Sequence, residues 1–230
     1  MMGCLLIFVA TNCIGSQILT RYRHLGPIQV NRLRSDAILS VVRGEWGSVA
    51  KSVVELTEAG AAHPPVPKGV DFSKVNAFLW TSYHDVILPF YLVGGTPVSP
   101  VWSGRSKYRT AFEAKYEFCE RLTLEEKRKN WLAVDALLTE ANPRMKKALV
   151  FYDYSRLFQN RKHHATGLAV ADSYMMHTLG PLGWSLFPAG LGVPIRKDAI
   201  KNDWCHYSLP WRAMFADTVM GTLGFRRPNE

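Results

Sequence analysis

The stretch "MMGCLLIFVATNCIGSQILTRYRHLG", residues 1–26, decides how the rest of the chain is interpreted. An apolar run extends from Cys4 to Leu19. It is shorter than the roughly 20 apolar residues of a membrane-spanning helix, and it includes Asn12, Ser16 and Gln17. We therefore expect either a helix that dips into a membrane or packs on a partner, or part of a targeting presequence. The remaining alternative is a buried first helix of a soluble protein.

The charge pattern around this run indicates a cellular location. No acidic residue precedes Asp36, whereas four arginines do: Arg21, Arg23, Arg32 and Arg34. Arginine-rich segments without acids are typical of organellar import signals. The segment 1–34 is therefore predicted to contact a membrane or to act in targeting, and the protein is predicted to lie at the mitochondrial inner membrane.

Composition predicts a folded, basic protein. The 230 residues carry a net charge of +9, are 47% hydrophobic and 12% aromatic, and include seven tryptophans. A disordered basic tail would be poor in such residues. Three kinds of partner fit: anionic lipid, nucleic acid, and neighbouring subunits of a large assembly, where Trp and Arg are enriched.

Helical periodicity dominates the first half of the chain. Residues 35–60 predict a helical hairpin that is broken at "RGEWGS", where Gly44 and Gly47 disfavour a continuous helix. The segment 61–107 is predicted to be a Pro/Gly-rich arm that contains one helix over residues 71–83.

The segment 108–162 is predicted to be a helical core. Thr123 and Glu126 form a capping box that opens its most regular helix, which Asn142 and Pro143 end. A further amphipathic helix over 143–162 is predicted to turn a basic face towards lipid or a partner. The alternative is a basic side that is merely solvated. Its basic residues are Arg144, Lys146, Lys147, Arg156, Arg161 and Lys162.

The segment 163–230 is predicted to be an apolar, aromatic region in which a short helix and an extended stretch need a neighbour to cover them. Its histidines lack the close spacing of a metal site, so no metal ligand is assigned. Whether His163, His164, His177 or His206 binds anything stays open. Five tryptophans of the chain are predicted to lie at interfaces: Trp80, Trp102, Trp184, Trp204 and Trp211.

No catalytic signature is found. His84 and Asp85 are the closest to an acid–base pair, but adjacent residues cannot orient each other as a triad does. The four cysteines, Cys4, Cys13, Cys119 and Cys205, match no zinc template and are expected to be buried thiols. No catalytic residue and no cofactor is predicted, and cofactor-binding residues stay unknown.

Together these patterns predict a mainly α protein, with amphipathic helices joined by long Pro/Gly-rich irregular segments and room for one membrane-associated element. The predicted function is that of a non-catalytic accessory subunit of a mitochondrial inner-membrane complex, either the respiratory chain or the ATP synthase. Its partners would be other subunits and anionic lipid, with no small-molecule substrate. The alternatives are a mitochondrial ribosomal or other RNA-associated protein, and a soluble enzyme of unknown class.

Overall fold

A parallel β-sheet forms the centre of the molecule. The computed structural model describes residues 6–10, 13–30, 32–58, 69–100, 107–151, 162–188 and 208–227. The sheet has five strands in the order β2-β1-β3-β6-β7, and all four pairings are parallel. The strands are β1 (Leu6–Ala10), β2 (Pro27–Gln29), β3 (Val75–Trp80), β6 (Lys146–Phe151) and β7 (Ser185–Pro188).

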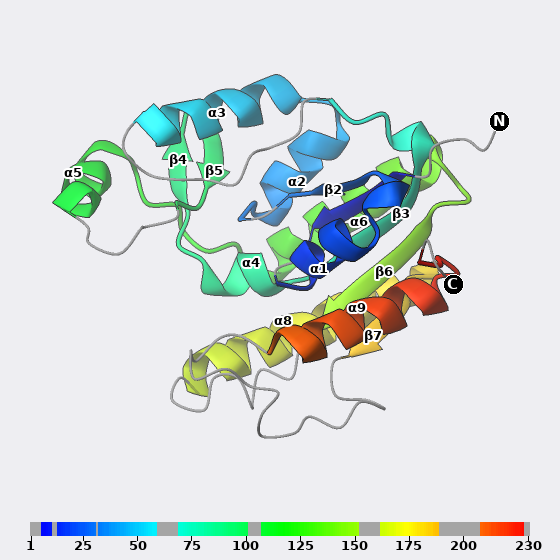
Figure 1. Cartoon of the computed structure of the whole chain (residues 1–230). Helices are drawn as coiled ribbons and strands as arrows, with labels where there is room; N and C mark the ends of the chain where they lie inside the picture. The colour runs from blue at the N-terminus through cyan, green and yellow to red at the C-terminus, as the bar shows by residue number, and fades with distance from the viewer. Residues whose placement is uncertain are drawn as a thin grey trace.

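Helices connect these strands and cover both faces of the sheet (Figure 1). The α-helices are α1 (Cys13–Arg21), α2 (Ser35–Val42), α3 (Trp46–Glu58), α4 (Tyr83–Ile87), α5 (Lys107–Lys115), α6 (Leu124–Ala141), α8 (Lys162–Leu179) and α9 (Leu209–Thr222). Short 3-10 turns are η1 (Arg23–Leu25), η2 (Phe72–Lys74) and η3 (Gly180–Leu182). A separate antiparallel hairpin consists of β4 (Tyr91–Val93) and β5 (Thr96–Val98).

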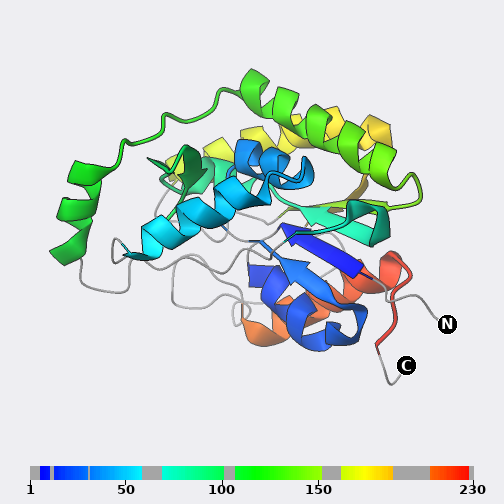
Figure 2. The same ribbon diagram turned by 90° about the horizontal axis from the view of Figure 1, so that it is seen from above.

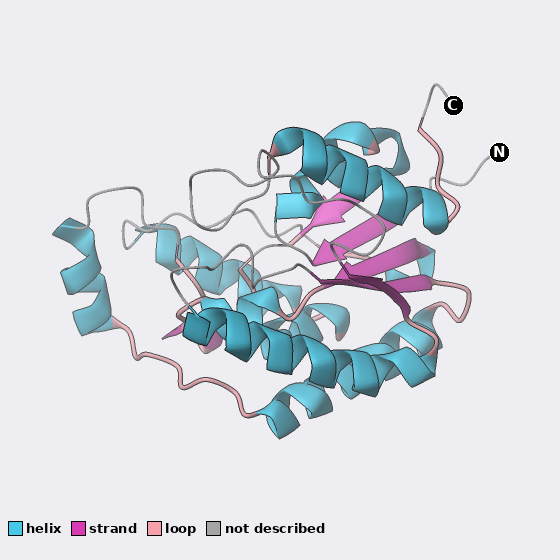
Figure 3. Ribbon diagram, turned by 90° about the horizontal axis from the view of Figure 1, so that it is seen from below, coloured by secondary structure: helices cyan, strands magenta, loops and turns pink. Residues whose placement is uncertain are grey.

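Two hydrophobic cores, one on each face, hold the layers together. Figure 2 shows α1 and α9 on one side of the sheet and α2, α3 and α6 on the other, and Figure 3 shows the sheet enclosed between helices. On the α6 side, Phe8 stacks on Phe78 with ring centroids 5.0 Å apart. On the α1 side, Ile7, Val9 and Leu79 pack against α1 and α9.

An ion-pair cluster joins α1 to α9 across the outside of the sheet. Arg21 at the end of α1 donates two hydrogen bonds to the Asp217 carboxylate of α9, at 2.9 and 2.6 Å. Tyr22 and Arg227 donate to the same carboxylate. Both helices follow a parallel strand, so their N-termini point to the same edge of the sheet.

The prediction of a mainly α fold is wrong, because the chain is an α/β protein with a parallel sheet. The stretch from Cys4 to Leu19 is not one helix: it contains β1, and α1 begins at Cys13. The helix expected over 71–83 is largely β3, and the basic helix expected over 143–162 contains β6. Strands that are buried on both faces are apolar throughout, and such short runs cannot be told from buried helix by periodicity.

Two local signals in the sequence correspond to features of the structure. Helices α2 and α3 lie within the segment 35–60, for which a hairpin is expected, and Gly44 adopts a left-handed φ of 83° between them. Helix α6 begins with the predicted capping box, in which Thr123 and Glu126 bond reciprocally.

None of the described helices combines the length and apolar character needed to cross a membrane. Four of the five expected segments supply strands to the one sheet.

Candidate active site at the carboxyl edge of the sheet

The strand order reverses between β1 and β3. From β1 the chain moves outward to β2, then returns past β1 to β3 and continues to β6 and β7. In open α/β sheets, ligands bind at such a reversal, in the crevice outside the carboxyl ends of the strands. The carboxyl ends of β1, β2 and β3 are therefore the place to look for a site.

Helix α1 begins at this edge, directly after β1. Its first residue is Cys13, three positions after the last residue of β1, Ala10. Gly15 allows the first turn to lie close to the sheet, since an added Cβ would come 3.1 Å from the Val9 side chain and closer still to Gln29. The free backbone N–H groups of a helix N-terminus carry partial positive charge, which favours anions and thiolates.

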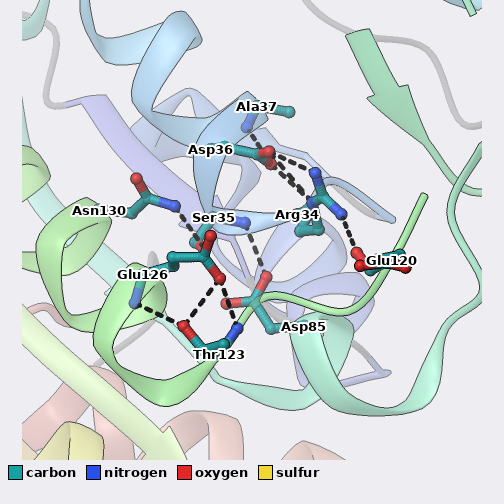
Figure 4. A network of polar contacts seen from close by, with 9 residues as sticks. All are labelled: Arg34, Ser35, Asp36, Ala37, Asp85, Glu120, Thr123, Glu126 and Asn130. Carbon is teal, nitrogen blue, oxygen red and sulfur yellow. Dashed lines mark hydrogen bonds and ion pairs between the residues drawn. The ribbon is translucent and has the colours of Figure 1, made fainter. Parts of the chain in front are cut away.

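The loops that follow β2 and β3 meet each other over the end of β1, which lies between the two strands. Asp85 of α4 accepts a hydrogen bond of 2.7 Å from the backbone N–H of Ser35, the first residue of α2. Leu33 forms an isolated bridge with Val98 of β5. Figure 4 shows Asp85 pointing at the N-terminus of α2 from below, with Thr123 and Glu126 of the α6 capping box beside it.

Asp85 is a buried acid whose pKa is raised to about 6, because burial disfavours its charged form. The Ser35 N–H and the positive charge of Lys127 oppose this effect. Lys127 is itself buried, and the loss of solvation lowers its pKa. The second carboxylate oxygen of Asp85, Oδ2, is buried and has no hydrogen-bond partner among the described residues. Asp85 thus stabilises the start of α2 through Oδ1, while Oδ2 accepts no hydrogen bond from the described residues.

Arg34 fixes the same loop from its other side. Its guanidinium pairs with the Asp36 carboxylate at 2.6 Å and donates to the Glu120 backbone carbonyl at 2.8 Å. It also lies over the Phe90 ring, 5.7 Å from the centroid. Burial lowers the pKa of the Arg34 guanidinium, but the hydrogen bonds and the charge of Asp36 outweigh this effect, so the pKa is raised. Figure 4 draws the contacts of Arg34 with Asp36 and Glu120. Arg34 is a neutralised structural cation.

Ser82 and Asp172 form a second buried polar pair at the end of β3. The Ser82 hydroxyl, which is fully buried, donates to Asp172 Oδ1 from α8. Burial raises the pKa of Asp172 to about 7, and the Ser82 hydrogen bond only partly opposes this. Perturbed acids of this kind collect at functional sites, although structural networks produce them as well.

Arg32 is the remaining charged residue of the loop after β2. Its guanidinium donates to the carbonyl oxygens of Ser99 and Pro100, at 3.2 and 2.6 Å. Burial lowers its pKa, and the nearby Tyr83 phenol opposes that shift. In the described part of the chain, no carboxylate lies within ion-pair distance of Arg32.

The basic residues predicted to face lipid or a partner do not share one helix face. Lys146 and Lys147 belong to β6 and bond within the chain. Lys146 donates to the Leu223 carbonyl, and Lys147 pairs with Asp135 at 2.5 Å. Arg144 is exposed in the turn before β6. Lys162 is the first residue of α8, while Arg156 and Arg161 lie outside the described residues.

The tryptophans predicted for interfaces are partly accounted for inside the molecule. Trp80, Trp184 and Trp211 are buried in the cores of this chain. The Trp184 ring N–H donates to Asp135 at 2.7 Å. Trp102 and Trp204 lie outside the described residues.

The histidines do not converge in the described part of the structure. His163 and His177 are exposed on α8, and His177 contacts the backbone of its own helix at Ser173. Only the backbone of His164 is described, and His206 lies outside the described residues. Among the described residues, no group of three or more His, Cys, Asp or Glu side chains is placed to hold a metal ion.

Sequence reasoning did not identify Cys13, Arg32 and Asp172 as site candidates. Their signal is positional: each lies on, or packs against, the segment that follows a strand, but β1, β2 and β3 were not recognised as strands. One feature of the sequence distinguishes Asp172: it is the only formally charged residue between His163 and Ile195. Asp85 was noticed beside His84, and both are buried in α4.

Comparison with solved structures gives a similarity over nearly the whole chain. No family model and no curated protein matches this chain. A solved structure described as a "putative GDSL-like lipase" from Parabacteroides merdae aligns over 97% of this chain and 97% of its own, with 12% sequence identity and a TM-score of 0.48.

The prediction of a non-catalytic, membrane-associated accessory subunit is wrong. It depended on a mainly helical chain whose apolar connections need neighbouring subunits to cover them. The chain instead forms an α/β sheet with two cores of its own and a strand-order reversal of the kind at which enzymes bind ligands. The correction extends to membership of a respiratory complex or the ATP synthase.

Proposed function

We propose that this protein is an enzyme of the hydrolase class that cleaves an acyl ester or thioester at the carboxyl edge of its sheet, with Cys13 as the nucleophile. One observation carries the proposal. Cys13 opens α1 directly after β1, at the point where the strand order reverses.

The start of α1 suits covalent acyl transfer. A thiol at the first residue of a helix is held more readily as thiolate, because the N-terminus carries partial positive charge. The same backbone N–H groups can stabilise the oxyanion that forms when a carbonyl is attacked. One position in the chain therefore offers a nucleophile and stabilisation of the tetrahedral intermediate.

The proposed reaction has two steps. The Cys13 thiolate attacks the acyl carbonyl carbon, the bond from that carbon to the leaving oxygen or sulfur breaks, and the leaving group takes a proton from water. Water then attacks the acyl-cysteine thioester, which releases the carboxylic acid and restores the thiol. No redox change and no additional reactant are needed.

The serines at this edge are poorly suited to the nucleophile's role. Ser82 and Ser99 are fully buried, and the Ser82 hydroxyl donates its proton to Asp172. Ser35 is also fully buried at the start of α2 and lies 3.3 Å from the Asn130 amide. A substrate carbonyl would have to displace core packing to reach any of them.

Hydrolysis of p-nitrophenyl acetate and of a short-chain acyl thioester tests the proposal. We expect Cys13→Ala to lower kcat/KM at least about 100-fold, as loss of a covalent nucleophile does in other hydrolases. The matched control is Cys119→Ser, which removes a thiol far from α1 in the sequence. Burial raises the pKa of the Cys119 thiol, and this variant should retain wild-type activity.

Two results would contradict the proposal. One is full activity in Cys13→Ala, and the other is a wild-type protein that leaves both probes intact. A thermal unfolding curve for each variant separates loss of the nucleophile from loss of the fold.

A further inference from the structure

The guanidinium of Arg32 is partly buried in the loop after β2, and no acid among the described residues neutralises it. Nε donates to the Ser99 carbonyl, and Nη2 donates to the Pro100 carbonyl and, at 3.4 Å, to the Ser99 hydroxyl. These neutral oxygens occupy one side of the fork. The other terminal nitrogen, Nη1, has no hydrogen-bond partner among the described residues.

The backbone at Arg32 is held in an unfavourable conformation. Its φ is 59°, and it is the only described non-glycine residue with a positive φ. Such strain costs free energy and persists at ligand-binding or active sites, where the surrounding contacts enforce it. A glycine or asparagine would adopt this backbone conformation at lower cost, so we expect the arginine side chain to have a specific role here.

Arg34, two residues further on, shows what a structural arginine in this loop looks like. It has a bidentate acid partner, a backbone acceptor and an aromatic ring beneath it. Within the part of the chain that the structure describes, the hydrogen-bond partners of Arg32 are backbone and hydroxyl oxygens alone. A partly buried cation is expensive to leave unpaired, and a bound anion removes that cost.

The position of Arg32 relates it to the proposed active site. The loop that carries it contacts α4 through Ser35 and Asp85, and thus crosses the carboxyl end of β1, where α1 begins with Cys13. Arg32 is close enough to Tyr83, the first residue of α4, to interact with it electrostatically. A group bound by Arg32 would therefore lie at the same edge as the reacting acyl group.

We propose that Arg32 binds an oxyanion, the carboxylate or phosphate group of the substrate, through its Nη1 group. The two N–H groups of Nη1 can donate charge-assisted hydrogen bonds to the oxygens of either anion. The substrate class is thereby narrowed to anionic acyl esters or thioesters. This narrowing depends on the proposed function, whereas the binding of an anion at Arg32 does not.

Anion-dependent thermal stability tests the binding site directly. Inorganic phosphate and acetate are titrated separately into wild-type protein, Arg32→Asn, Arg32→Lys and the control Arg43→Gln. Asn tolerates the left-handed backbone but removes the charge, and Arg43 is exposed at the end of α2. We expect at least one anion to raise the melting temperature of wild type and of the control.

In Arg32→Asn, the apparent dissociation constant of that anion should rise about tenfold or more, because a charge-assisted hydrogen-bonded contact is lost. Arg32→Lys, which keeps the charge but lacks the Nη1 group, should have a dissociation constant between those of wild type and Arg32→Asn. A preference for phosphate over acetate would identify a phosphate site, and the reverse a carboxylate site. Equal anion stabilisation of wild type and Arg32→Asn, or none in wild type, would overturn the proposal.

A substrate comparison then connects the anion to the chemistry. In wild type, kcat/KM should be higher for mono-p-nitrophenyl succinate than for p-nitrophenyl acetate. In Arg32→Asn, the ratio of these two values should fall about tenfold, because KM for the succinate ester rises. An unchanged ratio would contradict the narrowing. Repeating the titration with Cys13→Ala separates the two proposals, since anion binding should persist there even if Cys13 is not the nucleophile.

Discussion

Replacing Asp172 with Asn should change the pH dependence of stability in a defined direction. Asp172 is buried beneath α4, its carboxylate accepts from Ser82, and no cation among the described residues compensates it. Burial raises its pKa from the ordinary 3.8 to about 7. Asparagine keeps the shape and the acceptor but does not titrate.

The size of the effect follows from this pKa. Between about pH 4 and pH 7 the native state holds a proton on Asp172 that the unfolded state releases, so native stability falls as the pH rises. The pKa difference, at 1.36 kcal/mol per pH unit, corresponds to about 4 kcal/mol lost by pH 8. The Asn variant lacks this loss, so it should become more stable than wild type above pH 7.

Urea denaturation of both proteins at about pH 4, 6 and 8 measures this difference. The free energy of unfolding of Asp172→Asn minus that of wild type should increase with pH and level off above pH 7. Asp71→Asn is the matched control, because Asp71 is exposed and its neighbours Ser73 and Lys74 lower its pKa. A difference between Asp172→Asn and wild type that is constant from pH 4 to pH 8 would refute the reasoning.

Three further substitutions test the packing that supports the edge of the sheet, each by urea denaturation. Thr123→Ala removes one half of the α6 capping box and should cost about 1 kcal/mol, while Thr123→Ser should cost much less; equal losses would contradict the cap. Asp135→Ala leaves the Lys147 ammonium and the Trp184 ring N–H without their buried acceptor and should cost about 3 kcal/mol or more; a neutral result would show that solvent reaches Lys147. Trp131→Ala empties a fully buried core position and should cost about 3–5 kcal/mol; a loss below that would mean that the core refills the space.

Local signals predicted the start of α6 and the break between α2 and α3, because the residues that cause these features are close in sequence. The capping box of α6 and the left-handed Gly44 are both short-range features. Each satisfies or removes backbone hydrogen bonds within a few residues. Such features depend little on the rest of the fold.

The sheet could not be predicted in the same way. Residues of β1 pair with residues of β3 some 70 positions later, as Phe8 does with Phe78, and β3 pairs with β6 about as far on. A strand covered by helices on both faces has no polar alternation to mark it. The runs "LIFVA" and "ALVF" therefore matched a buried helix as well as a strand.

The candidate site was missed for the same reason. In a continuous helix from Cys4 to Leu19, Cys13 would be an ordinary thiol. Once β1 is recognised as a strand, Cys13 is the first residue of the helix that follows it. Arg32 was counted among import-signal arginines, and its left-handed backbone has no signature in the sequence. The predictions of anionic lipid or RNA as partners, and of a mitochondrial location, stay predictions.

The central claim is that Cys13 forms a covalent acyl intermediate. Wild-type protein is mixed with p-nitrophenyl acetate, quenched in acid within the first turnovers, digested and sequenced by fragment-ion mass spectrometry. The sequencing is needed because Cys4 and Cys13 lie in one tryptic peptide. We predict an acetyl group on Cys13 that is absent from Cys13→Ala. Acetyl on Cys119 or Ser82 in its place, or no acetylated residue while p-nitrophenol is released, would contradict the account.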